Sequence, residues 1–149
     1  MKKIFILILF IYSIVMTIFA IPTIKVAIEE VEPQVSLDAG ASDDQWKFLQ
    51  DLSKLVDYAD SLGYKLTGGE LWRTMYQQRY NVAHGLSWTY NSKHLKRRAI
   101  DLNLFIDDRY QQTCEAYEIL GQYWESLDPK NRWGGSWKHT KDCPHFERR

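Results

Sequence analysis

The sequence predicts an α+β domain, because helical stretches are interrupted by short strands that do not alternate regularly with them. Residues 43–62 repeat apolar side chains at helical spacing, and residues 98–105 alternate apolar and polar side chains as a half-buried strand does. With 149 residues, 45% of them hydrophobic, the chain is long enough for one domain with its own core.

A segment of different composition precedes this domain. Residues 1–22 begin with Met-Lys-Lys, continue without a charge through residues 4–20 and end at Pro22. This pattern is typical of a signal peptide or a signal anchor. We therefore expect an exported protein, periplasmic or extracellular, or one anchored to the cytoplasmic membrane by residues 4–20 if the segment is retained.

The predicted domain spans residues 43–149 and follows a linker. Residues 23–42 contain two apolar-acidic patches, a proline and a cluster of small residues, which suits a tether. The domain begins with a helix that ends before Gly63. The side chains expected to face the core are Trp46, Leu49, Leu52, Leu55 or Val56, Ala59 and Leu62.

The remaining elements follow in order along the domain. A short strand is predicted at residues 64–67, and a turn followed by a helix at residues 70–85. A strand at residues 98–105 and an amphipathic helix at residues 109–126 come next. The tail, residues 131–149, contains turn glycines, a proline and short aromatic pieces, and is predicted to form strands and loops.

Charge and cysteine content limit the possible functions. The 19 basic residues balance the 19 acidic ones, so no overall field attracts the chain to nucleic acid, although residues 93–98 contain four basic side chains. We therefore expect no nucleic-acid partner. Cys114 and Cys143 are too few for a disulfide scaffold and lack zinc-ribbon spacing, and the sequence leaves open whether they pair or stay free.

Two histidines stand at a short spacing from a carboxylate. Asp101 follows His94 by seven residues, at the entry to the predicted strand and on the face opposite its apolar side chains, and Asp142 precedes His145 by three. Catalytic zinc commonly takes three nitrogen or oxygen ligands and leaves a position for water, whose proton a nearby carboxylate accepts. The pattern predicts His94, Asp101 and His145 as Zn²⁺ ligands and Asp142 as the catalytic base.

Four stretches carry a resemblance to a known family. "SKHLKRRAID" at 92–101 resembles the Ser-x-His-x-x-Gly-x-Ala-x-Asp motif of the zinc D-alanyl-D-alanine carboxypeptidase and L-alanyl-D-glutamate endopeptidase family, which includes many phage endolysins. "DCPHFE" at 142–147 is similar to its closing Asp-x-x-His segment, and "RWGGSW" at 132–137 to a Trp-Gly-Gly-x-Trp stretch of its phage members. "TGGELWRTMYQQ" at 67–78 resembles its Thr-x-Gly-x-x-Arg-Thr-x-x-x-Gln block.

The resemblance covers about residues 45–147 and implies a hedgehog-like zinc peptidase domain, a small antiparallel sheet with flanking helices. It implies hydrolysis of peptide bonds in peptidoglycan stem peptides, as an endopeptidase or a D,D-carboxypeptidase. Arg73 and either Gln77 or Gln78 fall where the family binds peptide, and of the two glutamines we take Gln78. Ser92 either hydrogen-bonds the substrate or shapes the loop. A non-catalytic module with the same fold, which holds wall peptide without cutting it, is the alternative. We expect a monomer.

Two positions near the motif residues leave alternatives open. Arg97 occupies the usual glycine position, so either the arginine is strained at a positive φ or the loop takes another path. Glu147 either orients His145 from behind or is a charge at a strand edge.

Overall fold

The computed structural model describes residues 39–149, which form an α+β domain and confirm the predicted fold class. The predicted signal segment 1–22 and residues 23–38 of the predicted linker lie outside the described residues. Within residues 39–149, no helix has the length and apolar character that a membrane span requires. The elements are α2 (Ala39–Ser61), β1 (Lys65–Gly68), α3 (Met75–Ala83), the 3-10 helix η1 (Lys93–Lys96), β2 (Ala99–Ile106), β3 (Arg109–Gln111), α4 (Cys114–Leu127), β4 (Asn131–Trp133), the 3-10 helix η2 (Gly134–Ser136) and β5 (His145–Arg148).

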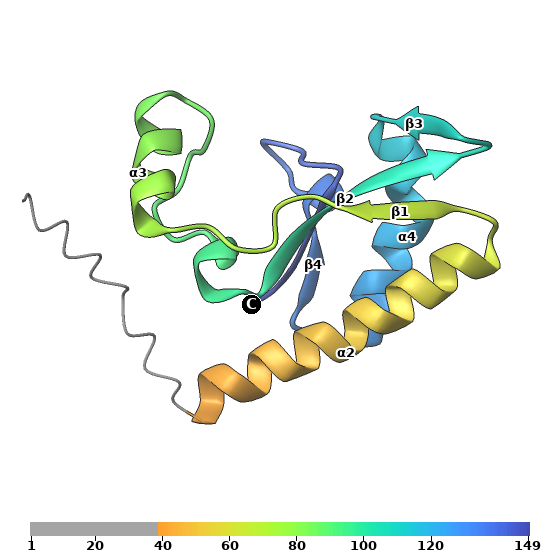
Figure 1. Cartoon of the computed structure of the whole chain (residues 1–149), viewed down its shortest axis with the longest axis horizontal. Coiled ribbons are helices and arrows are strands. Elements are labelled where there is room, and N and C mark those ends of the chain that lie inside the picture. The colour runs from red at the N-terminus through yellow and green to blue at the C-terminus, as the bar shows by residue number, and fades with distance from the viewer. Residues whose placement is uncertain (1–38) are drawn as a thin grey trace, which may run out of the picture. The chain divides into compact units, whose positions relative to one another are not determined.

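The five strands form one antiparallel sheet around β2, in the order β1-β2-β5-β4, with β3 also paired to β2. The first half of β2 pairs with β5, and the second half pairs with β1 and β3. In this register Asp101 lies directly opposite His145. Helices α2 and α4 pack against the sheet and each other, whereas α3 is set apart from both (Figure 1).

The core lies between the sheet and these two helices. On β2 the alternation predicted from the sequence is present, since Ile100, Leu102 and Leu104 are buried against the helices. The other buried side chains of the cluster are Phe48, Leu55 and Ala59 from α2, Tyr117, Leu120 and Trp124 from α4, Trp133 from β4 and Phe146 from β5.

The core face of α2 differs from the prediction. Leu55 is fully buried as expected, but Trp46 is 56% exposed and Leu49 is 54% exposed. Phe48, which the prediction passed over, is fully buried. Because successive residues turn by about 100°, Phe48 and Leu55 share one side of the helix, while Trp46 and Leu49 lie roughly a quarter turn or more away. Apolar character at helical spacing did not reveal which stripe meets the sheet.

Two helix boundaries also differ from the prediction. Helix α2 begins at Ala39, so residues 39–42, predicted as linker, are helical. Helix α4 begins at Cys114, because residues 109–111 pair with β2 as β3 instead of starting the helix.

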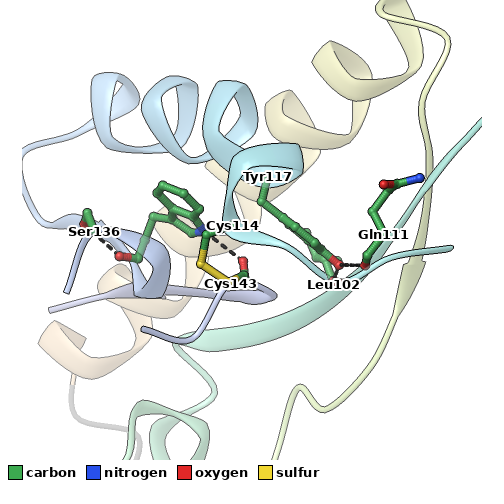
Figure 2. The surroundings of a disulfide bond; sticks show 7 residues. Leu102, Gln111, Cys114, Tyr117, Ser136 and Cys143 are labelled. Carbon is green, nitrogen blue, oxygen red and sulfur yellow. Dashed lines mark hydrogen bonds between the residues drawn. A yellow bond between two sulfur atoms is a disulfide. The ribbon is translucent and has the colours of Figure 1, made fainter. Parts of the chain in front are cut away.

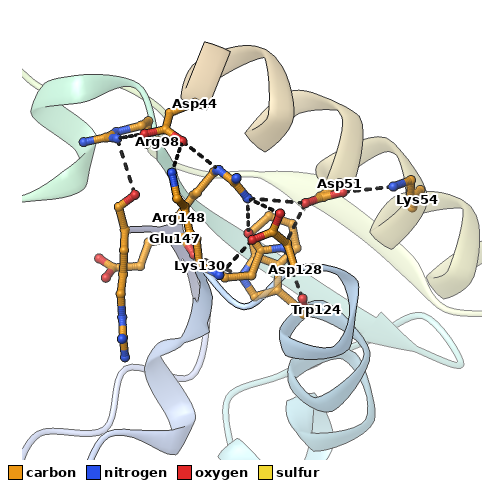
Figure 3. A network of polar contacts seen from close by, with 11 residues as sticks. Asp44, Asp51, Lys54, Arg98, Trp124, Asp128, Lys130, Glu147 and Arg148 are labelled. Carbon is orange, nitrogen blue, oxygen red and sulfur yellow. Dashed lines mark hydrogen bonds and ion pairs between the residues drawn. The ribbon is translucent and has the colours of Figure 1, made fainter. Parts of the chain in front are cut away.

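A buried ionic network ties β5 to the rest of the domain (Figure 3). Arg148, at the end of β5, is only 4% exposed. Its Nε lies 3.2 Å from Asp44 Oδ1 on α2, and its Nη1 lies 3.0 Å from Asp128 Oδ2 after α4. Asp44 Oδ2 also accepts a 2.6 Å hydrogen bond from Arg98. Breaking a buried ion pair by removing one partner typically costs about 3–5 kcal/mol, so this network holds the strand that carries His145.

Candidate metal centre

The structure brings the three predicted metal ligands together. His94 lies in η1, Asp101 in β2 and His145 at the start of β5. His94 Nε2 lies 3.2 Å from His145 Nδ1 and 3.4 Å from Asp101 Oδ1, and His145 Nδ1 lies 3.0 Å from the same Asp101 oxygen. Within residues 39–149, these three side chains lie close enough together to hold one metal ion.

The spacing of the three ligand atoms fits zinc. A tetrahedral ion bound at about 2.0–2.1 Å separates neighbouring nitrogen or oxygen ligands by about 3.3 Å. The three pairs observed here, at 3.0, 3.2 and 3.4 Å, span that value. Because two imidazoles and one carboxylate form the triangle, the donor set also suits zinc and leaves a fourth position open for water.

The loop that presents His94 requires an uncommon backbone conformation. The Ser92 hydroxyl caps η1 by accepting a 3.3 Å hydrogen bond from the backbone N–H of His94. At the other end, Arg97 adopts φ 51° and ψ 38°, in the left-handed region. The strained alternative is therefore the one observed, at a cost of about 1 kcal/mol. The guanidinium of Arg97 lies 5.2 Å from the centre of the Trp72 ring, which offsets part of this cost.

The electrostatics of the metal-free centre favour a proton shared between His145 and Asp101. Burial acts against the charged form of His145, but hydrogen bonds to Asp101 and Glu147 outweigh it and raise the pKa of His145 to about 9. Burial likewise acts against the ionised form of Asp101, yet His145 and His94 hold the pKa of that carboxyl well below its usual range. A metal ion must therefore displace a proton from His145 near neutral pH.

Glu147 lies behind His145, and this position decides between the two roles that the sequence left open, orienting His145 or serving as a strand-edge charge. Its Oε2 lies 3.1 Å from His145 Nε2, while its Oε1 pairs with the Arg132 guanidinium. Burial would raise the pKa of Glu147, but His145 and Arg132 hold it below the ordinary value. Because a carboxylate accepts the Nε2 proton, the lone pair of Nδ1 faces Asp101 and His94 once the proton shared with Asp101 has been displaced. Glu147 orients the ligand.

A cavity of about 500 Å³ opens onto these ligands. Asp142, Arg73 and Ser92 line it together with the three ligands, as the sequence predicted for a common site. Burial, together with the negative charge of Asp101, raises the pKa of Asp142 above the ordinary aspartate value. No hydrogen bond within residues 39–149 engages the Asp142 carboxylate, so it faces the cavity as a free acceptor.

The backbone of Asp142 is packed closely against η2. Its N–H donates a 3.1 Å hydrogen bond to the carbonyl of Gly134. A Cβ at Gly134 would lie 2.3 Å from the Asp142 carbonyl oxygen and 3.0 Å from the Cβ of His145. Glycine is therefore required here for close approach, which gives a physical reason for the Gly-Gly pair in "RWGGSW".

Arg73 and Gln78 have different places in the structure. Arg73 lines the cavity, where Glu70 accepts from its Nε at 2.7 Å and Gln78 Oε1 accepts from its Nη1 at 2.8 Å. Gln78 is fully buried, does not line the cavity and also donates to Ser87 Oγ at 2.8 Å. The predicted substrate contact of Gln78 is thus replaced by a supporting one, because its amide joins Arg73 to the following loop.

Some cavity residues were not expected from the sequence. Trp88 and Trp137 line the cavity, with ring centres 6.1 Å apart and nearly perpendicular planes. Arg132, Lys138 and Lys141 add positive charge to the wall. These side chains come from loops and from β4, where no periodicity or ligand spacing marks a residue as facing a cavity.

Comparisons with known proteins agree with this geometry. The profile of a peptidase family described as D-alanyl-D-alanine carboxypeptidase matches residues 80–148. Among solved structures, the chain is similar to the L-Ala D-Glu endopeptidase ChiX of Serratia marcescens, with a TM-score of 0.59 and 22% identity over 73% of this chain and 86% of that chain. At this identity the likeness establishes the fold. A search of curated proteins found no significant match.

The family profile, the fold and the His-Asp-His centre together support a metallopeptidase. The profile match agrees with the resemblance found in the sequence: residues 80–148, which contain every predicted metal ligand and the predicted base, match the model of the D-alanyl-D-alanine carboxypeptidase family.

Proposed function

We propose that this protein is a zinc-dependent hydrolase of peptide bonds in peptidoglycan stem peptides. The observation that carries the proposal is a three-ligand centre at the base of a cavity, with the carboxylate of Asp142 beside it and unused by any hydrogen bond in residues 39–149. The family profile and the endopeptidase named for the similar structure support peptidoglycan peptide as the substrate.

The chain's own residues account for the proton transfers. A zinc ion held by His94, Asp101 and His145 would supply a Lewis acid and a water of lowered pKa. Asp142 accepts the proton of the attacking water and returns it to the leaving amine, which is the work of a general base that becomes a general acid. Burial, which raises the pKa of Asp142, makes the carboxylate a better proton acceptor than an exposed aspartate.

The cavity wall favours an acidic peptide. The hydrogen bonds that Arg73 donates to the Glu70 carboxylate raise the pKa of Arg73, so its guanidinium stays charged and keeps N–H groups beyond those bound to Glu70 and Gln78. Lys138 and Lys141 add further positive charge. Since stem peptides carry several carboxylates, we infer that Arg73 binds a substrate carboxylate and thereby places the scissile bond.

The proposal is tested by digesting isolated peptidoglycan and identifying the products by mass spectrometry. Wild-type protein reconstituted with zinc should release new amino termini, and the mass of the products should separate an internal cut from removal of a terminal D-residue. Protein stripped of metal and the Asp142→Asn variant are the controls, and both should be inactive. Tight binding of wall peptide by zinc-loaded wild-type protein without any new amino terminus would instead support the binding-module alternative.

We also propose that the protein acts outside the cytoplasmic membrane, exported or anchored through residues 4–20. The charge-free N-terminal run supports this, and so does the disulfide between Cys114 and Cys143, because such bonds persist in oxidising compartments. Cell fractionation with N-terminal sequencing tests both forms of export, and a full-length cytoplasmic protein would contradict them.

A further inference from the structure

The two cysteines form a disulfide next to the proposed base (Figure 2). Cys114 is the first residue of α4, and Cys143 directly follows Asp142. Their Cα atoms lie 4.8 Å apart and they are 29 residues apart in the chain. The bond thus connects a core helix to the segment that carries both Asp142 and His145.

The Cys114 end of the bond is fixed by the core. Three residues further along α4, the fully buried Tyr117 hydroxyl accepts a 3.0 Å hydrogen bond from the Leu104 N–H and donates one of 2.9 Å to the Leu102 carbonyl. Both partners belong to β2, the strand that contains Asp101. The start of α4 is therefore held in a constant position relative to the metal centre.

The Cys143 end of the bond belongs to a segment that has few other contacts on its N-terminal side. Residues 138–141, which lead into Asp142, are exposed, and no hydrogen bond or ion pair within residues 39–149 anchors them. After Asp142, the carbonyl of Cys143 accepts a 2.8 Å hydrogen bond from the Trp133 indole. The position of Asp142 is therefore set by its own backbone hydrogen bonds, to the Gly134 carbonyl and from the His145 N–H, and by the disulfide at the next residue.

The metal ligands do not depend on the bond to the same degree. His94 and Asp101 lie outside the segment, and His145 is held by pairing with Asp101 in the sheet and by its hydrogen bond to Glu147. The ionic network of Arg148 fixes the far end of the same strand. Loss of the disulfide should therefore move the base more than the ligands.

Resting on the proposed function, we propose that the Cys114–Cys143 disulfide positions Asp142, so that the peptidase reaches full turnover only when this bond is oxidised. Reduction transfers two electrons from a dithiol to the disulfide. It breaks the sulfur–sulfur bond, leaves two thiols on the protein and converts the dithiol to its cyclic disulfide. Because a displacement of about 1 Å at a catalytic group can cost about 100-fold in rate, kcat should fall by roughly 10- to 100-fold. KM and metal content should change little.

The experiment compares zinc-loaded wild-type protein in its oxidised form, after reduction with dithiothreitol, and after reoxidation. The reductant is removed under nitrogen before each measurement, because dithiothreitol binds zinc. Peptide release gives kcat and KM, elemental analysis gives metal content, and circular dichroism shows whether the protein is folded. The Cys114→Ala/Cys143→Ala variant is the matched control. It should resemble reduced wild-type protein, and dithiothreitol treatment should not change its rate further.

Reduced protein that is folded and fully zinc-loaded, with a lowered kcat that reoxidation restores, is the expected result. A reduced form with kcat within twofold of the oxidised form would overturn the inference, and so would loss of zinc or of folded structure on reduction, since the bond would then serve the ligands or the whole fold. If the double variant does not fold, the reduction and reoxidation of wild-type protein decide the matter. Inactive oxidised, zinc-loaded protein would instead overturn the proposed function, and this inference with it.

Discussion

Replacement of Glu147 by glutamine is the sharpest test of how the chain prepares His145 for a metal. The two ring nitrogens of His145 face two carboxylates, Asp101 at 3.0 Å from Nδ1 and Glu147 at 3.1 Å from Nε2. Glu147 is only 5% exposed, and its second oxygen pairs with Arg132. Glu147 therefore has two donors to satisfy, and water has little access to replace either contact.

Glutamine keeps the size of Glu147 but offers one acceptor oxygen where the carboxylate has two. Either the Nε2–H of His145 or the Arg132 guanidinium then faces an amide N–H, and the charge that stabilises the metal-bound imidazole is lost. Removing such a partner of a metal-bound histidine typically weakens metal binding by about 10- to 100-fold. That range corresponds to about 1.4–2.7 kcal/mol.

The loss should depend on pH in a defined direction. Glu147 also helps raise the pKa of His145 to about 9, so the metal competes with a proton below that pH. The substitution lowers this pKa and weakens the competing proton, which offsets part of the loss at pH 7. We therefore expect the Glu147→Gln variant to lose more zinc affinity, relative to wild type, at pH 9 than at pH 7.

Competition with a chromophoric chelator measures zinc affinity at both pH values. Glu118→Gln is the matched control, because Glu118 lies on the exposed face of α4, where within residues 39–149 its carboxylate accepts only from Gln122. This control should bind zinc as wild type does. A Glu147→Gln affinity within twofold of wild type at pH 9 would refute the orienting role of Glu147.

Four further predictions concern the centre and its surroundings. Asp101→Ala should lose zinc and activity together, whereas Asp142→Asn should keep zinc while kcat falls by about 100-fold or more. Elemental analysis measures the zinc and peptide release measures kcat. Loss of zinc in both variants would show that the roles of the two aspartates are wrongly assigned. Zinc binding should release about one proton at pH 7 and fewer above pH 9, because His145 is protonated in the metal-free centre. Calorimetry in buffers of different ionisation enthalpy measures the number of protons released. In urea unfolding, Arg97→Gly should be about 1 kcal/mol more stable than Arg97→Ala, since both lack the guanidinium and only alanine opposes a positive φ; equal stability would contradict the strain. Deletion of residues 1–38 should leave activity on isolated walls largely intact, because α2 begins at Ala39, and a folded but inactive truncation would contradict this.

The local patterns of the sequence were sufficient to predict several parts of this protein. The period-two alternation of β2 placed Ile100, Leu102 and Leu104 in the core and Asp101 on the other face, because strand geometry alone dictates which side chains share a side. The spacings between histidines and carboxylates, together with the family motif, predicted His94, Asp101 and His145 as metal ligands, and the structure brings these three side chains together. The same motif marked Arg97 as a position of either backbone strain or an altered loop path.

Other features required the tertiary structure, because they depend on contacts between residues far apart in the chain. The face of α2 that is buried depends on where the sheet lies, so Phe48 could not be separated from Trp46 by periodicity. The Cys114–Cys143 pairing closes 29 residues of chain, and no spacing rule chose it over two free thiols. Gln78 matched the motif in position, but its burial behind Arg73 changes its role from substrate contact to support.

The metal centre shows both what the sequence determined and what only the tertiary structure decided. The sequence by itself determined the chemistry of the ligands, because residue type and motif spacing are written in the chain. Only the tertiary structure decided which nitrogen of His145 faces the metal position, since that depends on Glu147 on one side and Asp101 on the other. Asp101 is 44 residues from His145 in the chain and meets it through the pairing of β2 with β5, and the register of two strands is set by the packing of the whole sheet.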